Sequence, residues 1–156
     1  MRYVFWDKGL AATAQRYARQ CDFRHSNNRV GVGENIWAAA FASFENAVNL
    51  WYKEVHDKRC RCPHSYKHCC GHYTQVVWAD TDSLGCGYAR CSRVQGLRGS
   101  YRYVLICHYS PQGNLIMLTS RGTYALPAFR WTNGTHGHCS ECPAGMRHCY
   151  KNKLCY

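Results

Sequence analysis

The sequence predicts a disulfide-rich α+β fold, and three patterns carry this prediction. Apolar residues recur at helical spacing in two early segments, residues 8–21 and 44–56. Two later segments, 84–91 and 101–109, are rich in aromatic and apolar residues, which is typical of strands. Twelve cysteines, an even number, indicate a framework of disulfides in a chain of 156 residues, which has the size of one domain.

The two helices are predicted from their caps and their apolar faces. Asp7 is a suitable N-cap for the first helix, and five residues share its apolar face: Leu10, Ala14, Tyr17, Ala18 and Cys21. Ser43 can cap the second helix, whose apolar stripe consists of Phe44, Val48, Trp51, Tyr52 and Val55. Glu54 lies at the flank of that stripe, where a carboxylate needs a partner if it is buried.

The two strands are expected to form an antiparallel pair joined by a basic loop, followed by a turn at residues 111–114. Residues 115–138 show no clear periodicity and are predicted to be an extended connector. The tail from Cys139 onward is too small to have a core. It would need two disulfides, each worth about 2–4 kcal/mol, to hold a shape.

Cysteine usage indicates an oxidising, extracellular setting, since such a framework persists there. The sequon at Asn133, a candidate glycosylation site, agrees with this setting. No apolar run is long enough to cross a bilayer, and no signal peptide precedes Met1. We therefore expect a secreted protein of which this chain is a fragment, an incomplete gene model or a processed form.

Basic charge is concentrated in the second half of the chain. Residues 1–82 carry eleven Lys and Arg against eight Asp and Glu, whereas residues 83–156 carry nine against one, Glu141. A basic surface outside the cell favours sulfated glycans or anionic lipid head groups as partners. No nucleic-acid-binding motif accompanies the charge, so nucleic acid is not expected. A solvated basic face with no partner is the alternative.

His72 is the first candidate site residue. It follows Gly71 and precedes the apolar run from Val76 to Trp78, so it is expected to be held at the edge of the core. A histidine in such a place is either a hydrogen-bonded structural group or a ligand. Just upstream, residues 60–70 have Cys and His spacing that would suit zinc, although local disulfides are favoured in an oxidising compartment.

Four motifs resemble those of the CAP superfamily, which comprises cysteine-rich secretory, antigen-five and pathogenesis-related class-one proteins. Residues 71–78 and 103–114 resemble its two signatures, and residues 33–37 and 51–54 resemble two further motifs in the expected order. The resemblance covers nearly all of residues 5–114. Residues 139–155 resemble the four-cysteine hinge of cysteine-rich secretory and glioma-pathogenesis-related members, a branch that includes peptidase-inhibitor-like proteins.

The resemblance implies an α-β-α sandwich with a small antiparallel sheet between helices. It divides the chain into a CAP domain over residues 1–114, a connector over 115–138 and a hinge-like module over 139–156. The family's usual first helix is missing, so folding without it is in question, and the connector is longer than usual. The six-cysteine module of channel-blocking members does not follow, so a channel-toxin role is not supported.

The resemblance also implies that His25, Glu34, Glu54 and His72 converge in one cleft. Two neutral imidazoles, His25 and His72, can bind a divalent metal such as zinc, although catalytic zinc usually has three protein ligands. Glu34 and Glu54 can orient those imidazoles or bind the water on the metal. The alternative is a buried hydrogen-bond network that fixes the packing of the loop and helices.

By the same resemblance, four cysteine pairs are expected: Cys21 with Cys91, Cys86 with Cys107, Cys139 with Cys149 and Cys142 with Cys155. Four further cysteines, Cys60, Cys62, Cys69 and Cys70, would be bonded among themselves in an order that is left open.

The expected function is a secreted, non-enzymatic interaction module with a metal-capable cleft that binds a protein, a glycan or a sterol-like lipid. The aromatic residues Trp37, Phe41 and Phe44 could line an apolar groove or belong to the core. One alternative is a metal-dependent hydrolase, most plausibly a peptidase, that uses the His/Glu cleft. Another is a basic surface that binds sulfated glycans.

Overall fold

The computed structural model describes residues 1–27, 29–58, 70–129, 139, 142–146, 148–151 and 154–156, and the structural statements below concern these residues. The elements in chain order are β1 (Phe5–Trp6), α1 (Lys8–Ala18), β2 (Gly33–Ala39), α2 (Phe44–Lys53), the 3-10 helix η1 (Glu54–His56), α3 (Gly71–Val76), β3 (Ser83–Arg90), β4 (Tyr103–Ser110), β5 (Ile116–Thr119), β6 (Gly122–Ala125), β7 (Cys149–Tyr150) and β8 (Leu154–Cys155).

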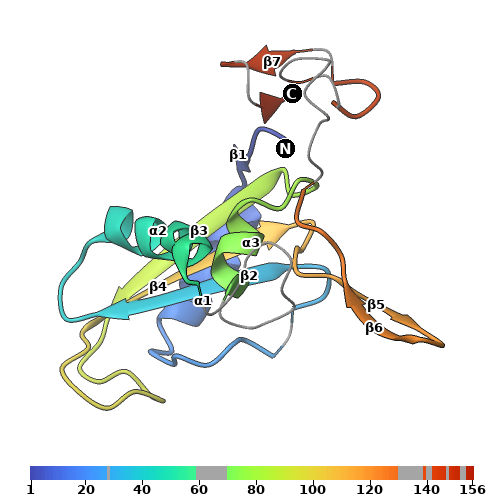
Figure 1. The fold of residues 1–156 in the computed structure, drawn as a ribbon. Helices are drawn as coiled ribbons and strands as arrows, with labels where there is room; N and C mark the ends of the chain where they lie inside the picture. The colour runs from blue at the N-terminus through green and yellow to red at the C-terminus, as the bar shows by residue number, and fades with distance from the viewer. Residues whose placement is uncertain (28, 59–69, 130–138, 140–141, 147, 152–153) are drawn as a thin grey trace.

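The main sheet has the strand order β1-β3-β4-β2 and lies between two helical layers (Figure 1). The predicted antiparallel pair is present as β3 and β4, and β2 pairs antiparallel with β4 on its other side. The two-residue strand β1 pairs parallel with β3, so the sheet is mixed at that edge. Helix α1 covers one face, and α2 and α3 cover the other, which gives the α-β-α sandwich.

Alternation along β4 divides the core between the two faces. Val104 and Ile106 pack toward α1 with Ala14 and Ala18, whereas Leu105, Cys107 and Tyr109 pack with Trp51 and its neighbours on the other face. His108 falls on the α1 face by the same alternation, as its contact with Thr13 shows. Because β2 pairs residue for residue with β4, Glu34 lies opposite His108 on that face.

The two predicted helices are present, and the structure also contains shorter elements that were not predicted. Asp7 caps α1, accepting a hydrogen bond of 2.7 Å from the Leu10 amide. The helix expected over residues 44–56 is present as α2 followed by η1. Strand β2 and helix α3 were not predicted as elements: in β2 the polar pair Glu34 and Asn35 follows Gly33, and α3 has only six residues. None of the helices in the described part of the chain is long and apolar enough to cross a membrane.

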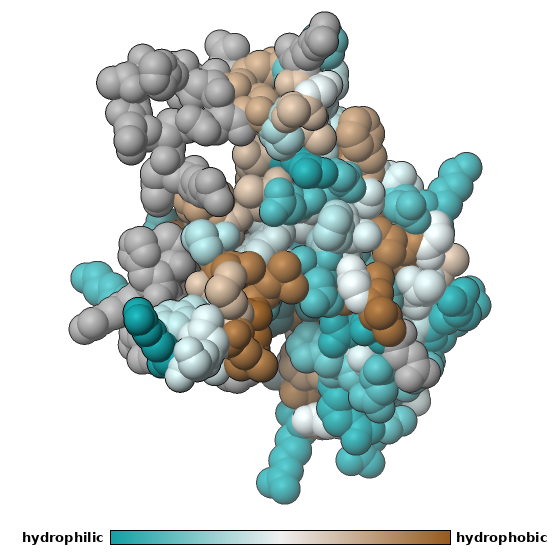
Figure 2. All heavy atoms as spheres, turned by 90° about the vertical axis from the view of Figure 1, so that its right-hand side faces the viewer, coloured by the Kyte–Doolittle hydropathy of each residue, from teal (hydrophilic) through white to brown (hydrophobic). Residues whose placement is uncertain are grey.

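The segment expected as an extended connector contains a β-hairpin, β5–β6. Its apolar side chains are exposed: Ile116, Met117 and Tyr124 are about half exposed, and Leu118 is 76% exposed. Figure 2 views the molecule from the side toward which the hairpin points in Figure 1 and shows hydrophobic groups gathered on this face. The prediction missed the hairpin because neither strand alternates between apolar and polar residues.

The tail forms a small two-stranded sheet, β7–β8, held by the disulfides Cys139–Cys149 and Cys142–Cys155. It contacts the start of the chain, since the Tyr3 amide donates to the Cys155 carbonyl at 2.8 Å. Two further disulfides are Cys21–Cys91 and Cys86–Cys107. Together, the four are the pairs that the family resemblance implies. Cys70 is also disulfide-bonded, while Cys60, Cys62 and Cys69 lie outside the described residues.

Two glycines of β3, Gly85 and Gly87, allow α1 to lie directly on the sheet. A Cβ atom at Gly87 would lie 2.3 Å from the backbone N and Cα of Gln15, and one at Gly85 would lie 2.1 Å from the Ala11 amide nitrogen. Distances this short require the helix backbone to move, because no flexible side chain is there to rotate away. The close contact of α1 with the sheet therefore depends on these glycines.

We predict that Gly87→Ala lowers the free energy of unfolding by about 2–3 kcal/mol, because overpacking displaces α1. Urea denaturation of the oxidised protein measures this change. Gly71→Ala is the matched control, because its added Cβ would meet only the Asn114 side chain, at 3.8 Å. A Gly87→Ala variant as stable as Gly71→Ala would show that α1 does not need this close approach.

Candidate histidine–glutamate site

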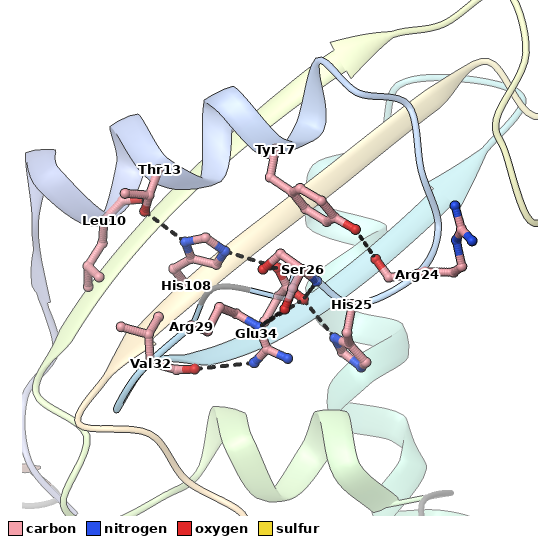
Figure 3. A network of polar contacts seen from close by, with 10 residues as sticks. All are labelled: Leu10, Thr13, Tyr17, Arg24, His25, Ser26, Arg29, Val32, Glu34 and His108. Atoms are coloured by element: carbon pink, nitrogen blue, oxygen red, sulfur yellow. Dashed lines mark hydrogen bonds and ion pairs between the residues drawn. The ribbon is translucent and has the colours of Figure 1, made fainter.

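Glu34 is a fully buried carboxylate with several hydrogen-bond donors around it (Figure 3). Its Oε1 accepts from Nδ1 of His25 at 2.7 Å and from the Ser26 amide at 3.0 Å. Its Oε2 accepts from the Ser26 hydroxyl at 2.8 Å and from Nε2 of His108 at 3.0 Å. The Arg29 Nε lies 3.4 Å from Oε1 and adds a positive charge. Both carboxylate oxygens are thus satisfied.

These donors keep Glu34 ionised. Burial alone raises the pKa of the carboxyl, but the hydrogen bonds from His108, His25 and Ser26 outweigh burial and hold the pKa of Glu34 well below its usual range. An ionised carboxylate can only accept hydrogen bonds, so Nδ1 of His25 and Nε2 of His108 must carry protons. Glu34 therefore fixes the orientation of both rings.

His108 is a member of this network that the sequence did not single out, although it stands in the motif 103–114. Its side chain is 5% exposed, and its Nδ1 lies 2.8 Å from the Thr13 hydroxyl on α1. The β2–β4 register places it opposite Glu34. Pairing the two motifs as antiparallel strands would have revealed this neighbour, but the sequence contains no local signal for the register.

Glu54 and His72 form a second pair on the other side of the sheet. The Glu54 carboxylate accepts from Nδ1 of His72 at 2.7 Å and from the Tyr73 amide at 3.0 Å. Trp51, which is buried, stacks on the His72 ring with centroids 5.9 Å apart and planes 9° from parallel. The His72 side chain remains 34% exposed, so its ring is fixed in orientation and still reaches solvent.

The four predicted residues thus occur as two pairs joined across β2. Glu34 faces α1, while its neighbour Asn35 donates from Nδ2 to the His72 carbonyl oxygen at 3.1 Å. In Figure 3 the His25 ring extends past β2, away from α1. Convergence of both pairs in one cleft stays a prediction.

A cleft of about 790 Å³ adjoins the first pair. It lies between α1 and the loop before β2, and its lining includes His25, His108, Tyr17, Arg16 and Arg24. Glu54 and His72 are not among the residues that line it. The cleft therefore belongs to the His25 side of the site and to the α1 layer.

Each pair presents an imidazole whose Nδ1 is held by a carboxylate. No described residue donates to or accepts from Nε2 of His25 or His72, so in a neutral ring this nitrogen is open to a ligand. Carboxylate–histidine–metal arrangements use the same geometry, in which the carboxylate fixes the tautomer and raises the basicity of the ring. The chemistry of both pairs thus fits a divalent metal.

The described residues contain one group of three potential ligands whose atoms lie within 4.8 Å of one another: Cys139, Cys142 and Cys155. These sulfurs are in disulfides, and zinc binds cysteine as the thiolate, so this group does not fit a metal. Asn133 lies outside the described residues. Of the three aromatic residues that could line a groove, Trp37 is in the core and Phe41 is 62% exposed.

We predict that Glu34→Gln lowers the free energy of unfolding at neutral pH by about 2–4 kcal/mol, because buried donors lose a charged acceptor. The folded-state pKa of Glu34 lies below its unfolded value of about 4.3, so its contribution is present above that pH and is lost as pH falls further. The difference between wild type and variant should therefore shrink from about pH 5 to about pH 2.5.

Urea denaturation at several pH values measures this difference. Glu45→Gln, which removes the same charge from an exposed position on α2, is the matched control and should stay close to wild type throughout. A Glu34→Gln penalty that does not change with pH would show that the charge of Glu34 is not what stabilises the loop.

Comparison with known proteins places these features in a family. The model of the CAP, or cysteine-rich secretory protein, family matches residues 1–109. Protein lon-1 of Caenorhabditis elegans is 54% identical over 158 residues, which are 100% of this chain and 50% of that protein. Human peptidase inhibitor 16 is 39% identical over 160 residues, 99% of this chain and 31% of that protein. The chain thus spans half the length or less of these relatives.

Two solved structures share the fold. Na-ASP-1 has a TM-score of 0.74 at 24% identity, over 100% of this chain and 38% of that one. The structure titled NaASP2 with Zn2+ has a TM-score of 0.73 at 27% identity, over 100% of this chain and 77% of that one. With the family model matching more than two thirds of its residues, this chain belongs to the CAP, or cysteine-rich secretory protein, family.

Proposed function

We propose that this chain is an extracellular CAP-family interaction module whose His25 and His72 bind zinc, with Glu34 and Glu54 as their supporting carboxylates. The observation that carries the proposal is the shared geometry of the two pairs. In both, a carboxylate holds Nδ1 at 2.7 Å and leaves Nε2 open. NaASP2, which is 27% identical to this chain, has a solved structure titled with Zn2+. Disulfides and the secretory character of the family support an extracellular setting.

Two histidines supply fewer ligands than a structural zinc site, which usually has four, so we expect weak binding with water in the remaining positions. Bound zinc would act as a Lewis acid and could present a coordinated water or a partner's side chain. The residues of the chain contribute orientation: Glu34 is fixed by His108 and Ser26, and Trp51 stacks on His72. The site is thus built to present two imidazoles in fixed poses.

The hydrogen bond that the Ser26 hydroxyl makes favours a binding function over hydrolysis. The Ser26 hydroxyl, next to His25 in sequence, donates to Oε2 of Glu34. A serine nucleophile needs a base that accepts its proton, usually an imidazole. Ser26 is instead part of the scaffold that keeps Glu34 ionised. A hydrolase would have to rely on metal-bound water alone, and we therefore rank it second.

We predict that the refolded chain binds one zinc ion and that His72→Ala abolishes this binding. Glu54→Gln should weaken it by about 10–100-fold, the usual effect of removing a carboxylate that orients a ligand. Isothermal titration calorimetry near neutral pH measures both changes. His25→Ala should match His72→Ala if both rings bind the same ion.

His56→Ala is the matched control, because His56 is exposed on η1 close to Glu54 in sequence. Zinc binding that is unchanged in His72→Ala, or lost equally in His56→Ala, would contradict the proposal. The His/Glu pairs would then be a structural network.

A further inference from the structure

We infer that five exposed or cleft-lining arginines form a docking surface for a sulfated glycan. These residues, called the arginine surface below, are Arg16, Arg24, Arg93, Arg98 and Arg102. The inference rests on the proposed function only for the extracellular setting. Glycan binding by the arginine surface does not require zinc at the histidines. It is drawn from where the fold gathers positive charge.

The fold brings two distant segments together at the end of α1. The disulfide Cys21–Cys91 links them, and the backbone pairs directly: the Gln95 amide donates to the Cys21 carbonyl at 2.7 Å, and the Phe23 amide donates to the Gln95 carbonyl at 3.0 Å. The loop between β3 and β4, at the lower left of Figure 1, therefore packs against the segment after α1.

Arg24 joins this loop to the cleft. A Cβ atom at Gly96 would lie 3.9 Å from Cγ of Arg24, and Arg24 lines the cleft together with Arg16. Arg93, Arg98 and Arg102 stand on the same loop and are exposed. The basic lining of the cleft thus continues onto the exposed loop, which suits a chain-like anion longer than a single small ligand.

Few acidic groups neutralise this surface. The Asp22 carboxylate accepts hydrogen bonds from Nε and Nη2 of Arg24 at 2.6 to 3.0 Å. Nη1 of Arg24 does not bind Asp22, and the Arg24 side chain is 73% exposed. Between Asp82 and Glu141 the sequence has no acidic residue. Five arginine charges against the one charge of Asp22 leave a net charge of +4.

The residue type points to sulfate. All five positions are arginine, and the planar guanidinium donates two parallel hydrogen bonds to oxyanions, whereas lysine acts as a point charge. The neighbouring Arg29 is excluded, because it donates to the Ser26 and Val32 carbonyls and lies beside Glu34. Arg102 donates to the Ser92 carbonyl, which orders the loop that carries the other guanidinium groups. Outside the cell, sulfated polysaccharides present such oxyanions in a row.

The test compares two triple variants of the full chain on immobilised heparin, with non-sulfated hyaluronan and phosphatidylserine vesicles as parallel probes. The surface variant is Arg16→Gln/Arg93→Gln/Arg98→Gln, which changes three arginines with no hydrogen bond or ion pair from their side chains to the described residues. The matched control, Lys8→Gln/Lys53→Gln/Arg121→Gln, removes the same charge from other exposed positions.

We expect the surface variant to bind heparin at least about tenfold more weakly at physiological salt, since it loses three close charge contacts. The control should change by less than about threefold, because none of its three residues lines the cleft or stands on the loop between β3 and β4. Wild-type binding should weaken as salt rises and should be weaker to hyaluronan, which has carboxylates and no sulfates.

Equal losses in the two variants would overturn the inference and assign binding to net charge. Binding to vesicles in preference to heparin, lost in the surface variant, would assign the surface to membranes instead. Absence of heparin binding by a chain that still binds zinc would remove this inference alone. Heparin binding by a chain that does not bind zinc would remove the metal proposal alone.

Discussion

The burial of one ionised carboxylate, Glu34, is the constraint on which the His25 side of this domain depends. A buried charge without partners is far more costly than any single packing interaction, so its surroundings must supply donors. Strand β4 supplies His108, and the loop before β2 supplies His25, Ser26 and Arg29. The path of that loop is thereby set by hydrogen bonds rather than by an apolar core of its own.

The helices pack differently on the two faces of the sheet. On the α1 face, Gly85 and Gly87 remove side chains so that the helix backbone can approach the sheet, and residues of the C-terminal half of α1 line the cleft. On the opposite face, Trp37 and Trp51 fill the volume under α2. His72 is stacked against this filled region, whereas His25 hangs from the loop with 59% of its side chain exposed. The His72 ring is held by packing and by the Glu54 carboxylate, whereas the His25 ring is held by the Glu34 carboxylate.

Local sequence patterns predicted the two helices and the two central strands. The helix from Lys8 shows helical periodicity, and the strands around 84–91 and 101–109 are rich in aromatic and apolar residues. The family motifs gave the four cysteine pairs and the four candidate residues. Strand β2 escaped prediction because Glu34 and Asn35 make it look polar. Their burial becomes possible only through partners such as His108, 74 residues away. The hairpin β5–β6 escaped for the opposite reason, since its apolar residues are exposed and follow no burial pattern.

The loop between α1 and β2 connects the metal proposal to the arginine surface. Tyr17, on α1, donates to the Arg24 carbonyl at 2.6 Å, and the next residue is His25, bound to Glu34. A glycan on Arg24 and a metal on His25 would therefore bind adjacent residues of one short segment, fixed at both ends by hydrogen bonds. Any effect of one ligand on the affinity of the other must be reciprocal. Because Asp22 already orders Arg24 and Glu34 already orders His25, little conformational entropy remains to be lost when either ligand binds.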